Sequence, residues 1–412
     1  MLSMDDKNVS SKEAKELEAQ YGARNYKPIP VVIHKAEGIW VYDPEGKKYL
    51  DCLSAYSAVN QGHRHPRIIK ALKDQADVLT LTSRAFYNDK LGIFLKKLCD
   101  YAGFEMALPM NTGAEAVETA IKMARRWGYE QKKVPNDKAE IIVVADNFHG
   151  RTTTIVGFST DPDAYGGYGP KTPGFIIVPY NDASAIEKAI TSNTVAVLIE
   201  PIQGEAGVII PSKGYLKKIR DTCTANNVLM ILDEIQTGFC RTGKRFAFQH
   251  EGIKPDAITV GKALGGGCIP VSAVLSSRKL LGVFTPGSHG STFGGNPLAC
   301  AVGMESINVL VDEKLDEQAE ELGNYFKEKL LSLKQKTSII KEVRGIGLLI
   351  AIEIVRDKNF KARQITEKLM EKGVLAKETH EYTIRFAPPL VITKEDIDWA
   401  YNIIEQVLLS LI

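Results

Sequence analysis

Two residues of opposite charge follow apolar stretches near the middle of the chain and could act on the same small molecule. Asp233 closes the run VLMILD, and Lys262 comes directly after the run AITVG. In open α/β sheets, ligands bind outside the carboxyl ends of the strands, so we expect both side chains to reach one crevice. An amine there can form a Schiff base with a carbonyl group, and a carboxylate can hold a cationic nitrogen. On this pattern alone, a turn-capping Asp233 and a solvated Lys262 remain the alternative.

A third feature is a predicted helix that begins next to a glycine. In the string NTGAEAVETAIKMARR the apolar residues follow the i, i+3, i+4, i+7 spacing of an amphipathic helix, at Val117, Ala120, Ile121 and Ala124. The helix start, just after Asn111, presents free backbone N–H groups and the positive end of the helix dipole, which suit a phosphate. Ordinary helix capping gives the same pattern. The chain has no complete G-x-x-x-x-G-K-[ST] or G-x-G-x-x-G motif, which disfavours a nucleotide loop.

These three features together match what pyridoxal phosphate requires from a protein. Its aldehyde needs an amine for a Schiff base, its ring nitrogen needs an anion to stay protonated, and its phosphate needs hydrogen-bond donors. A carboxylate near the ring nitrogen raises the pKa of that nitrogen and preserves the positive charge that stabilises a carbanion. We therefore expect pyridoxal 5'-phosphate as the cofactor.

The composition argues against several other classes of protein. Of the 412 residues, 52 are Lys or Arg and 50 are Asp or Glu, so the formal net charge is only +2. This balance gives no general attraction to nucleic acid or to a membrane surface, and we expect neither as a partner. The hydrophobic share of 44% is typical of a globular chain with a large core.

The cysteines and the start of the chain indicate the cellular compartment of the protein. The six cysteines are widely scattered with no C-x-x-C pair, which disfavours a disulfide framework and a zinc ribbon. Roughly the first 20 residues are polar and include acidic residues, so they fit neither a secretion signal nor a transit peptide, and whether they are ordered stays open. We therefore expect a cytoplasmic protein.

The elements that must position the chemical groups form an alternating pattern between about residues 109 and 277. Helical patterns, such as 183–190 and 215–225, alternate with the apolar runs EIIVVAD, FIIVPY, VAVLIE, VLMILDE, AITVG and VSAVL. Runs that are apolar on both faces are typical of parallel strands buried between helices. We predict an α/β fold with a mostly parallel sheet flanked by helices, in which these runs are the parallel strands.

Later segments predict a second, smaller domain. The loop TPGSHGSTFGGNP is rich in glycine, and Asn296 followed by Pro297 predicts the start of a helix. Beyond it, helical patterns alternate with the strand-like strings VRGIGLLIAIEI and YTIRFAPPL, as in an α+β domain. We divide the chain into an N-terminal segment associated with the small domain, a large cofactor-binding domain and a C-terminal small domain, at 1–60, 61–298 and 299–412.

Several strings also resemble a known family. The class-III aminotransferases, which have pyridoxal-phosphate fold type I, are similar to this chain in LDEIQTGFCRTGK, ITVGKALGGG, EPIQGEAGV, NTGAEAVETA and HGSTFGGNPLAC. The resemblance covers nearly the whole chain. Five further strings resemble the ornithine aminotransferase branch of that family more closely than its other branches: GARNYKPIPV, LSAYSAVNQGHRHP, LTSRAFYND, NFHGRT and RFAPPLVI.

The resemblance implies roles for residues around the cofactor. Lys262 would form the Schiff base and move a proton between the substrate carbon and the cofactor, and Asp233 would hold the ring nitrogen. Gln236 would contact the phenolic oxygen of the cofactor, and Phe148 would stack on its ring. Lys262 and Asp233 are thereby the implied catalytic residues.

The resemblance also implies an assembly of two subunits. Gly113 and Ala114 would donate backbone amides to the cofactor phosphate. Thr292 would contact the phosphate of the neighbouring subunit's cofactor. The implied protein is a homodimer with active sites at the subunit interface.

For the substrates, the resemblance implies L-ornithine and 2-oxoglutarate, in a ping-pong transfer of the δ-amino group. Arg151 would bind the α-carboxylate of ornithine, Tyr26 would meet its α-amino group, and Tyr56 would shape the pocket so that the δ-amine faces the cofactor. Arg385 would pair with Glu205 during the ornithine half-reaction and, once released, would bind the oxoacid as a bidentate fork. A purely structural salt bridge between these two residues is the alternative.

Two other functions stay open. Acetylornithine and 4-aminobutyrate aminotransferases share the same fold, but their substrates lack the free α-amino group that Tyr26 and Tyr56 would serve. A catalytically inactive binding protein of this fold would be expected to have lost Lys262 or Asp233, and both are present.

Four further residues invite a functional interpretation. His63 and His65 stand in GHRHP, a Gly/Pro loop with no third ligand in view, so a solvated turn is favoured over a metal site. Cys240 lies near the string LDEIQTG without an adjacent general base, which favours a packing role. The role of His149 stays open.

Overall fold

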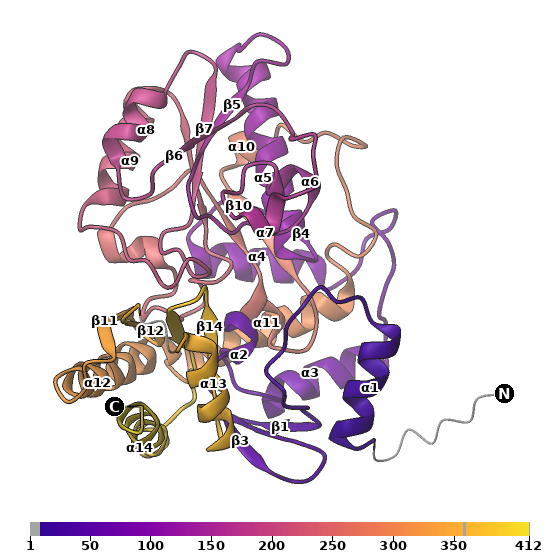
Figure 1. Ribbon diagram of the computed structural model, residues 1–412. Coiled ribbons are helices and arrows are strands. Elements are labelled where there is room, and N and C mark those ends of the chain that lie inside the picture. The colour runs from indigo at the N-terminus through magenta and orange to yellow at the C-terminus, as the bar shows by residue number, and fades with distance from the viewer. Residues whose placement is uncertain (1–8, 357–359, 412) are drawn as a thin grey trace.

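The computed structural model describes residues 9–356 and 360–411 and is built around a seven-stranded sheet (Figure 1). The strand order is β4-β10-β9-β8-β7-β5-β6. The strands are β4 (Met106–Met110), β5 (Glu140–Val144), β6 (Phe175–Val178), β7 (Thr194–Ile199), β8 (Leu229–Asp233), β9 (Ala257–Val260) and β10 (Ser272–Ser276). From β6 through β5, β7 and β8 to β9, each strand is parallel to the next, which confirms the predicted parallel sheet.

Helices cover both faces of this sheet because its strands are apolar on both sides. Along β5, Ile141 and Val143 belong to one core with α5, whereas Ile142 and Val144 belong to another with α4, α8 and α9. The helices of this part are α4 (Leu91–Ala102), α5 (Gly113–Trp127), α6 (Thr153–Val156), α7 (Pro162–Tyr165), α8 (Ala183–Ala189), α9 (Tyr215–Ala225) and α10 (Arg278–Leu281). Helices α8 and α9 confirm the two crossover helices that the sequence predicts.

The direction of β10 differs from the prediction. It pairs antiparallel with both of its neighbours, with Ala273 opposite Val260 of β9 and opposite Pro109 of β4. A parallel connection needs a dozen or more residues, usually with a helix, and the segment from Val260 to Ser272 is too short for one. The expectation that VSAVL is a parallel strand is therefore wrong, and the sheet is mixed.

Two four-stranded sheets complete the fold. Leu50 of β3 pairs in parallel with Val374 of β13, so the N- and C-terminal parts of the chain share one of them. The sheets consist of β1 (Lys35–Glu37), β2 (Trp40–Tyr42), β3 (Lys48–Asp51) and β13 (Val374–Leu375), and of β11 (Ile340–Ile346), β12 (Leu349–Ile354), β15 (Thr383–Phe386) and β14 (Lys377–Thr379). The predicted fold class, a large α/β part with a smaller α+β part from both ends of the chain, is confirmed.

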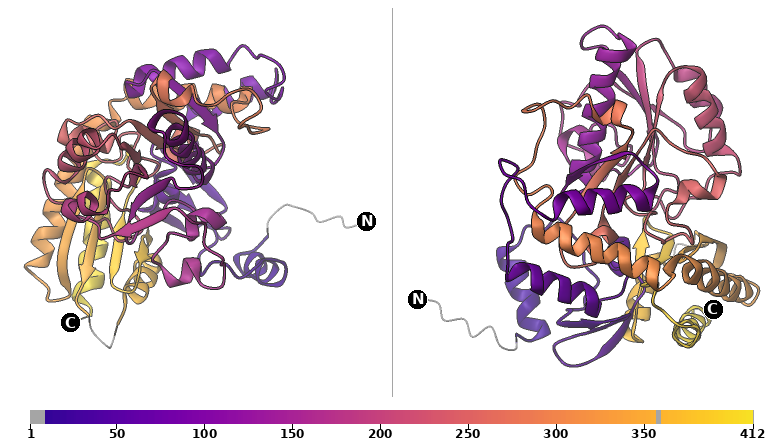
Figure 2. Two further views of the ribbon diagram at one scale, coloured as in Figure 1. Left: turned by 90° about the horizontal axis from the view of Figure 1, so that it is seen from above. Right: turned by 180° about the vertical axis from the view of Figure 1, so that it is seen from behind.

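The long helix α11 (Pro297–Asp312) lies between the large sheet and the smaller ones and packs on α3 and α4 (Figure 2). Asn296 Oδ1 accepts a hydrogen bond from the backbone N–H of Ala299 at 2.8 Å, which confirms the predicted helix start. The other helices outside the large sheet are α1 (Ser11–Tyr21), α2 (Ser54–Ser57), α3 (Pro66–Ala76), α12 (Leu315–Lys334), α13 (Ala362–Glu371) and α14 (Lys394–Leu409).

Helix α1 shows that part of the polar N-terminal stretch, whose order the sequence leaves open, is helical. The Ser10 side chain accepts a hydrogen bond from the backbone N–H of Glu13 at 3.2 Å and caps this helix. A good cap and well-spaced charged residues are enough for a surface helix that buries none of its side chains. Residues 1–8 of this stretch lie outside the described residues.

In 9–356 and 360–411, no helix combines the length and the apolar character needed to cross a membrane. The six cysteines are free. No group of three or more His, Cys, Asp or Glu side chains in these two ranges could hold a metal ion.

Candidate active site

A cavity opens at the carboxyl ends of β8 and β9, next to the start of α5. Asp233 is the last residue of β8, and Lys262 begins the 3-10 turn that follows β9. Both line the cavity, together with Gly113, Ala114, Phe148, His149, Gly150, Glu200, Ile202, Ile235, Gln236 and Thr237. Because β8 and β9 are neighbouring parallel strands, they bring the carboxylate and the lysine to one crevice.

The backbone of Lys262 is left-handed, with a φ of 46°. For a residue with a side chain this conformation costs on the order of 1–2 kcal/mol, and such strain concentrates at functional sites. Burial lowers the pKa of Lys262 below its ordinary value, against the charge of Glu205 and with the help of Arg385. A lowered pKa leaves more of the neutral amine that can attack a carbonyl carbon.

Asp233 is held by a buried histidine to which the sequence assigned no role. His149 Nδ1 lies 2.6 Å from Asp233 Oδ2, and the backbone N–H of Ile235 donates to Asp233 Oδ1 at 3.0 Å. Burial alone would lower the pKa of His149, but the hydrogen bond to Asp233 and its charge outweigh this effect and raise the pKa. An Nδ1–H on this imidazole donates to the carboxylate and orients it toward the cavity.

Glu200, which follows β7 directly, is a second cavity residue that the sequence reasoning missed. Its Oε2 accepts a hydrogen bond from the backbone N–H of Phe148 at 3.0 Å, and its Oε1 accepts one from Gly204 at 3.4 Å. Burial raises the pKa of Glu200 to about 7, although His149 opposes the shift. The strand-end rule, applied to the run VAVLIE, would have found this residue.

The start of α5 offers two free backbone amides. Thr112 and Glu115 form a capping box, in which the Glu115 N–H donates to Thr112 Oγ1 at 3.3 Å. The N–H groups of Gly113 and Ala114 have no acceptor within the helix and none elsewhere in the described ranges. A Cβ on Gly150 would lie 2.8 Å from the Cβ of Ala114, so glycine leaves this space open. The arrangement can hold a phosphate group.

Three polar side chains form a network beside the lysine. Arg385 Nη1 donates to Glu205 Oε1 at 2.8 Å and to Gln236 Oε1 at 3.2 Å, and Gln236 Nε2 donates to Glu205 Oε1 at 3.0 Å. Burial would raise the pKa of Glu205, but the charges of Arg385 and Lys262 prevail and lower it to about 2. A Cβ on Gly204 would lie only 1.7 Å from Gln236 Oε1, so the network requires glycine there.

Arg385 has hydrogen-bonding groups that this network leaves unused. The residue is 1% exposed, and its Nε and Nη2 have no acceptor among the described residues. Buried donors without partners cost free energy unless a ligand or water meets them. Since the guanidinium is a planar fork, its unpaired edge fits an incoming carboxylate.

Tyr56 lies on a turn of left-handed helix, α2 (Ser54–Ser57). All four residues of this turn have positive φ angles, between 45° and 72°. Ser54 Oγ donates to the carbonyl oxygen of Ala387 at 2.7 Å and so ties the turn to the C-terminal part of the chain. The ring of Tyr56 lies 5.1 Å from the guanidinium carbon of Arg385.

Three of the predicted site residues lie at the surface rather than in the cavity lining. Arg151 is exposed, with its guanidinium carbon 5.9 Å from the centre of the Phe148 ring. Tyr26 is 69% exposed on the segment before β1. Thr292 is exposed in the loop before α11 and does not line the cavity of its own chain.

The remaining candidates have ordinary structural surroundings. His63 Nε2 lies 2.8 Å from Asp51 Oδ2, and His65 Nε2 lies 2.9 Å from Glu313 Oε1. Each histidine thus has one acidic partner. Burial raises the pKa of Cys240 to about 12, which suits a packing residue of the core rather than a nucleophile.

The carboxyl edge of the α/β sheet brings together an amine, a carboxylate and backbone amides that can hold a phosphate. Comparison with known proteins identifies the class of enzyme that has such a site. The model of the family "Aminotransferase class-III" matches residues 21–408. The chain belongs to this family. Its members are pyridoxal-phosphate-dependent aminotransferases, and the chain is an aminotransferase of this class.

Individual relatives show which members of the family this chain is similar to. An ornithine aminotransferase from Brevibacillus brevis is 61% identical over 389 residues, which cover 94% of this chain and 96% of the relative. An ornithine aminotransferase structure from Toxoplasma gondii has a TM-score of 0.96 at 45% identity and covers 98% of this chain and 95% of its own. An acetylornithine aminotransferase from Elizabethkingia anophelis has a TM-score of 0.89 at 50% identity and covers 98% and 100%. The resemblance inferred from the sequence strings is confirmed.

Proposed function

We propose that this protein transfers the δ-amino group of L-ornithine to 2-oxoglutarate in a ping-pong reaction with pyridoxal 5'-phosphate. The products are glutamate 5-semialdehyde, which cyclises to pyrroline-5-carboxylate, and glutamate. The names of the relatives from B. brevis and T. gondii support ornithine as the substrate. The observation that carries the proposal is the Glu205–Arg385 pair, with Nη1 and Oε1 2.8 Å apart, close enough to Lys262 to affect its charge.

The residues that line the cavity fit the cofactor. The free amides of Gly113 and Ala114 suit its phosphate, Asp233 suits its ring nitrogen, and Lys262 suits its aldehyde. When bound, pyridoxal phosphate supplies an electrophilic carbon and a cationic ring that takes up the electrons of the substrate C–H bond. Phe148, which lines the cavity, offers its ring for stacking.

Lys262 moves the proton in this proposal. Its amine has a pKa lowered by burial, so it can take the proton from the δ-carbon of the substrate and hand it on. Asp233, held by His149, keeps the ring nitrogen protonated. Gln236 lines the same cavity and would hold the phenolic oxygen of the cofactor.

Glu205 and Arg385 allow one site to accept two different substrates. Ornithine presents an amine at its reacting end, whereas 2-oxoglutarate presents a carboxylate beside its reacting carbon. While Glu205 neutralises Arg385, the site does not draw an α-carboxylate to the reacting centre. When the pair opens, Nη1 joins the unpaired Nε and Nη2 in a fork for the oxoacid.

The far end of ornithine meets residues at the edge of the cavity. We assign its α-carboxylate to Arg151, its α-amino group to Tyr26, and the direction of the δ-amine to Tyr56. The exposed positions of Arg151 and Tyr26 and the contact of Tyr56 with Arg385 support this assignment. An arginine beside the open edge attracts a carboxylate, and a phenolic oxygen can accept a hydrogen bond from an ammonium group.

We also propose a homodimer with active sites at the subunit interface. Thr292 is exposed and does not line the cavity of its own chain, which supports a role at the phosphate in the partner's site. The division into 1–60, 61–298 and 299–412 belongs to the same proposal, with 61–298 as the cofactor-binding domain. The cytoplasmic location stays a prediction.

Acetylornithine aminotransferase is the second candidate, because a relative at 50% identity has that name. Its substrate has a blocked α-amino group. Tyr26 and Tyr56 favour a free α-amino group, and 4-aminobutyrate has none to offer them. The choice between these substrates is the purpose of the experiment that follows.

The test is the visible spectrum of the purified protein loaded with pyridoxal phosphate. L-Ornithine is added without an oxoacid, and N-acetylornithine and 4-aminobutyrate are added to separate samples. We expect the absorption band of the lysine-bound cofactor to disappear with ornithine and to return with 2-oxoglutarate as pyrroline-5-carboxylate forms. Lys262→Ala is the control, because it keeps the cavity but removes the amine.

Other outcomes change the assignment in distinct ways. A stronger response to N-acetylornithine or 4-aminobutyrate would keep the reaction type and move the substrate. A protein that develops no band after addition of pyridoxal phosphate would contradict the proposed cofactor and favour an inactive binding protein.

A further inference from the structure

The segment 23–33 links α1 to β1 and carries Tyr26 across the surface; we call it the strap. Most of its residues are exposed. Among the described residues, two hydrogen bonds connect the strap to the rest of the protein, and Arg363 of α13 donates both. Apart from the packing of its half-buried residues Ile29, Val31 and Val32, the strap is therefore held by one distant side chain.

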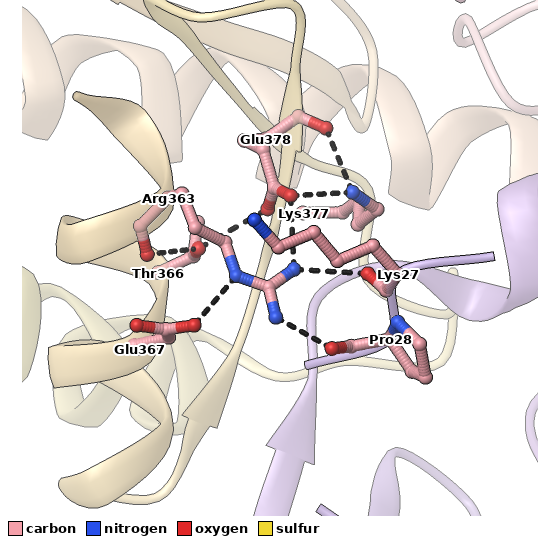
Figure 3. Close-up of polar contacts among 7 residues, drawn as sticks. All are labelled: Lys27, Pro28, Arg363, Thr366, Glu367, Lys377 and Glu378. Atoms are coloured by element: carbon pink, nitrogen blue, oxygen red, sulfur yellow. Dashed lines mark hydrogen bonds and ion pairs between the residues drawn. The ribbon is translucent and has the colours of Figure 1, made fainter. Parts of the chain in front are cut away.

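Arg363 uses both ends of its guanidinium for this contact (Figure 3). Nη1 donates to the carbonyl oxygen of Lys27 at 3.1 Å, and Nη2 donates to that of Pro28. Toward the body of the protein, Nε donates to Glu367 Oε1 at 2.6 Å and Nη1 donates to Glu378 Oε1 at 3.0 Å. The Arg363 side chain is only 17% exposed, so these charge-assisted bonds are largely shielded from water.

Glu378 of β14, which holds Arg363 in place, is itself fixed from two further sides. Lys377 Nζ donates to Glu378 Oε1 at 2.7 Å, and Thr366 Oγ1 donates to Glu378 Oε2 at 3.2 Å. Burial would raise the pKa of Glu378, but the hydrogen bonds from Lys377 and Arg363 lower it. The anchor is a connected network between α13 and β14 rather than a single surface ion pair.

This network adjoins the substrate side of the cavity. In the pairing of β14 with β15, Lys377 stands opposite Arg385. The ring of Tyr56 lies 5.1 Å from the guanidinium carbon of Arg385. Burial is the main cause of the raised pKa of Tyr56, and the charges of Tyr26 and Glu378 add to it. The strap, the anchor and the proposed ornithine-binding residues thus meet at one edge of the cavity.

We propose that Arg363 is a positioning residue for the amino-acid end of the substrate. By holding the carbonyl groups of Lys27 and Pro28, it places Tyr26, one residue before them, at the edge of the cavity. A strap without this anchor would have to be ordered each time substrate binds, which costs conformational entropy. The inference rests on the proposed function and extends it to a residue that does not touch the substrate.

The geometry of the anchor requires arginine rather than any cation. A guanidinium has five N–H donors in one plane and can serve two carbonyl oxygens and two carboxylates together. An ammonium group has three donors on a single nitrogen. Arg363→Lys therefore keeps the positive charge near Glu367 and Glu378, but we expect it to lose the hydrogen bonds to the strap.

The first test compares steady-state kinetics of the cofactor-loaded enzyme and its Arg363→Met and Arg363→Lys variants. In a ping-pong reaction, kcat/KM of each substrate reports its own half-reaction. We expect kcat/KM for ornithine to fall about tenfold in both variants, mainly through KM, and kcat/KM for 2-oxoglutarate to change less than about twofold. Lys361→Met is the matched control, since Lys361 stands at the start of the same helix and bonds to Glu381 instead of the strap.

The second test measures the strap itself by limited proteolysis. Trypsin can cut after Arg24 in a released strap, whereas Lys27 is followed by proline and resists cleavage. We expect cleavage at Arg24 to be about tenfold faster in both Arg363 variants than in the wild-type enzyme and unchanged in Lys361→Met.

The two tests separate this inference from the proposed function. Unchanged cleavage at Arg24, faster cleavage with an unchanged kcat/KM for ornithine, or an equal loss with both substrates would each overturn the positioning role. In those cases, ornithine turnover by the wild-type enzyme leaves the proposed function standing. A wild-type enzyme that does not use ornithine would refute the proposed function, and this inference with it.

Discussion

Glu205 pairs with Arg385 at 2.8 Å. In the proposed function, this pairing keeps Arg385 from drawing an α-carboxylate toward the reacting centre. In the variant Glu205→Ala, Arg385 should be free throughout the reaction cycle. We expect reaction at α-amino groups, for example that of L-alanine, to gain about 10- to 50-fold in kcat/KM relative to the δ-amino group of ornithine. This corresponds to a charge-assisted hydrogen bond of about 1.5–2.5 kcal/mol. The half-reactions can be followed by the loss of the visible band.

A second carboxylate provides the control for this variant. Glu353 also pairs with an arginine, Arg344, at 2.9 Å, but does not line the cavity. Glu353→Ala should leave the preference for the δ-amine unchanged. An unchanged preference in Glu205→Ala as well would show that the Glu205–Arg385 pair is a structural salt bridge.

His149 is the residue whose charge should make the stability of the cofactor-free protein depend on pH. Its pKa is raised in the fold, so the stabilisation by its protonated form is complete below the unfolded value of about 6.5 and is lost as the pH rises through the folded pKa. At pH 6, His149→Gln should lower the free energy of unfolding by about 2–3 kcal/mol. The deficit relative to wild type should shrink with rising pH, as measured by denaturant unfolding.

His250 is a suitable comparison because burial lowers its pKa instead. A histidine with a lowered folded pKa contributes stability above its unfolded pKa and loses it as the pH falls through the folded value. The deficit of His250→Gln should therefore grow with rising pH. A deficit of His149→Gln that also grows with pH would contradict the charged His149–Asp233 pair.

At the level of elements, the left-handed turn α2 is a strained support for Tyr56. Ala55 has φ 45° and ψ 49°, a conformation that costs a residue with a Cβ on the order of 1–2 kcal/mol and a glycine almost nothing. Glycine also adds about 0.5–1 kcal/mol of entropy to the unfolded chain. We therefore expect Ala55→Gly to raise the free energy of unfolding by up to about 1 kcal/mol.

An alanine in an ordinary helix gives the matched comparison. Ala71 lies in the middle of α3, where the backbone is right-handed and Ala→Gly should cost about 1 kcal/mol. Denaturant unfolding of the two variants should thus give changes of opposite sign. Equal destabilisation by both substitutions would mean that α2 is not strained.

The sequence predicts elements whose signal is local and misses those set by distant contacts. The apolar runs that became β5 to β9 were found, but an apolar run looks the same whether its strand is parallel or antiparallel, and the direction of β10 follows from its short connection to β9. The string LSAYSAVN contains no glycine, so nothing in it indicates a left-handed turn. That turn depends on the bond from Ser54 to Ala387, on a different part of the chain.

The same distinction holds in the site. Lys262 and Asp233 stand at the ends of recognisable strands, so their place in one cavity could be predicted. His149 could not be assigned, because its partner Asp233 is 84 positions away and nothing in the string NFHGRT specifies that contact. Glu200 was available from the strand-end rule and was overlooked.

At the level of the whole molecule, the proposed dimer makes Thr292 of one chain serve the cofactor of the other. Thr292→Ala should weaken cofactor binding about tenfold through loss of a charge-assisted hydrogen bond. A mixed dimer of Thr292→Ala and Lys262→Ala chains should nevertheless contain one intact site, which combines Lys262 of the first chain with Thr292 of the second. Activity of co-expressed, differently tagged chains at limiting cofactor measures this complementation.

The parental homodimers are the controls, with no activity for Lys262→Ala and reduced activity for Thr292→Ala at limiting cofactor. If Thr292 served its own chain, the mixed dimer would contain one dead site and one weakened site. Activity no higher than half that of Thr292→Ala would therefore rule out the shared site.

The pairing of β3 with β13 has a consequence for how the enzyme is made. The backbone N–H of Leu50 donates to Gly373 O at 2.8 Å. Because β3 is near the start of the chain and β13 near its end, β3 cannot pair until almost the entire chain has been translated. The large sheet with Lys262 and Asp233 can fold first. The turn that holds Tyr56, the anchor at Arg363 and the side chain of Arg385 all require the last segment synthesised. During synthesis, the part of the protein that would bind the cofactor can therefore form before the part that, in the proposed function, selects the substrate.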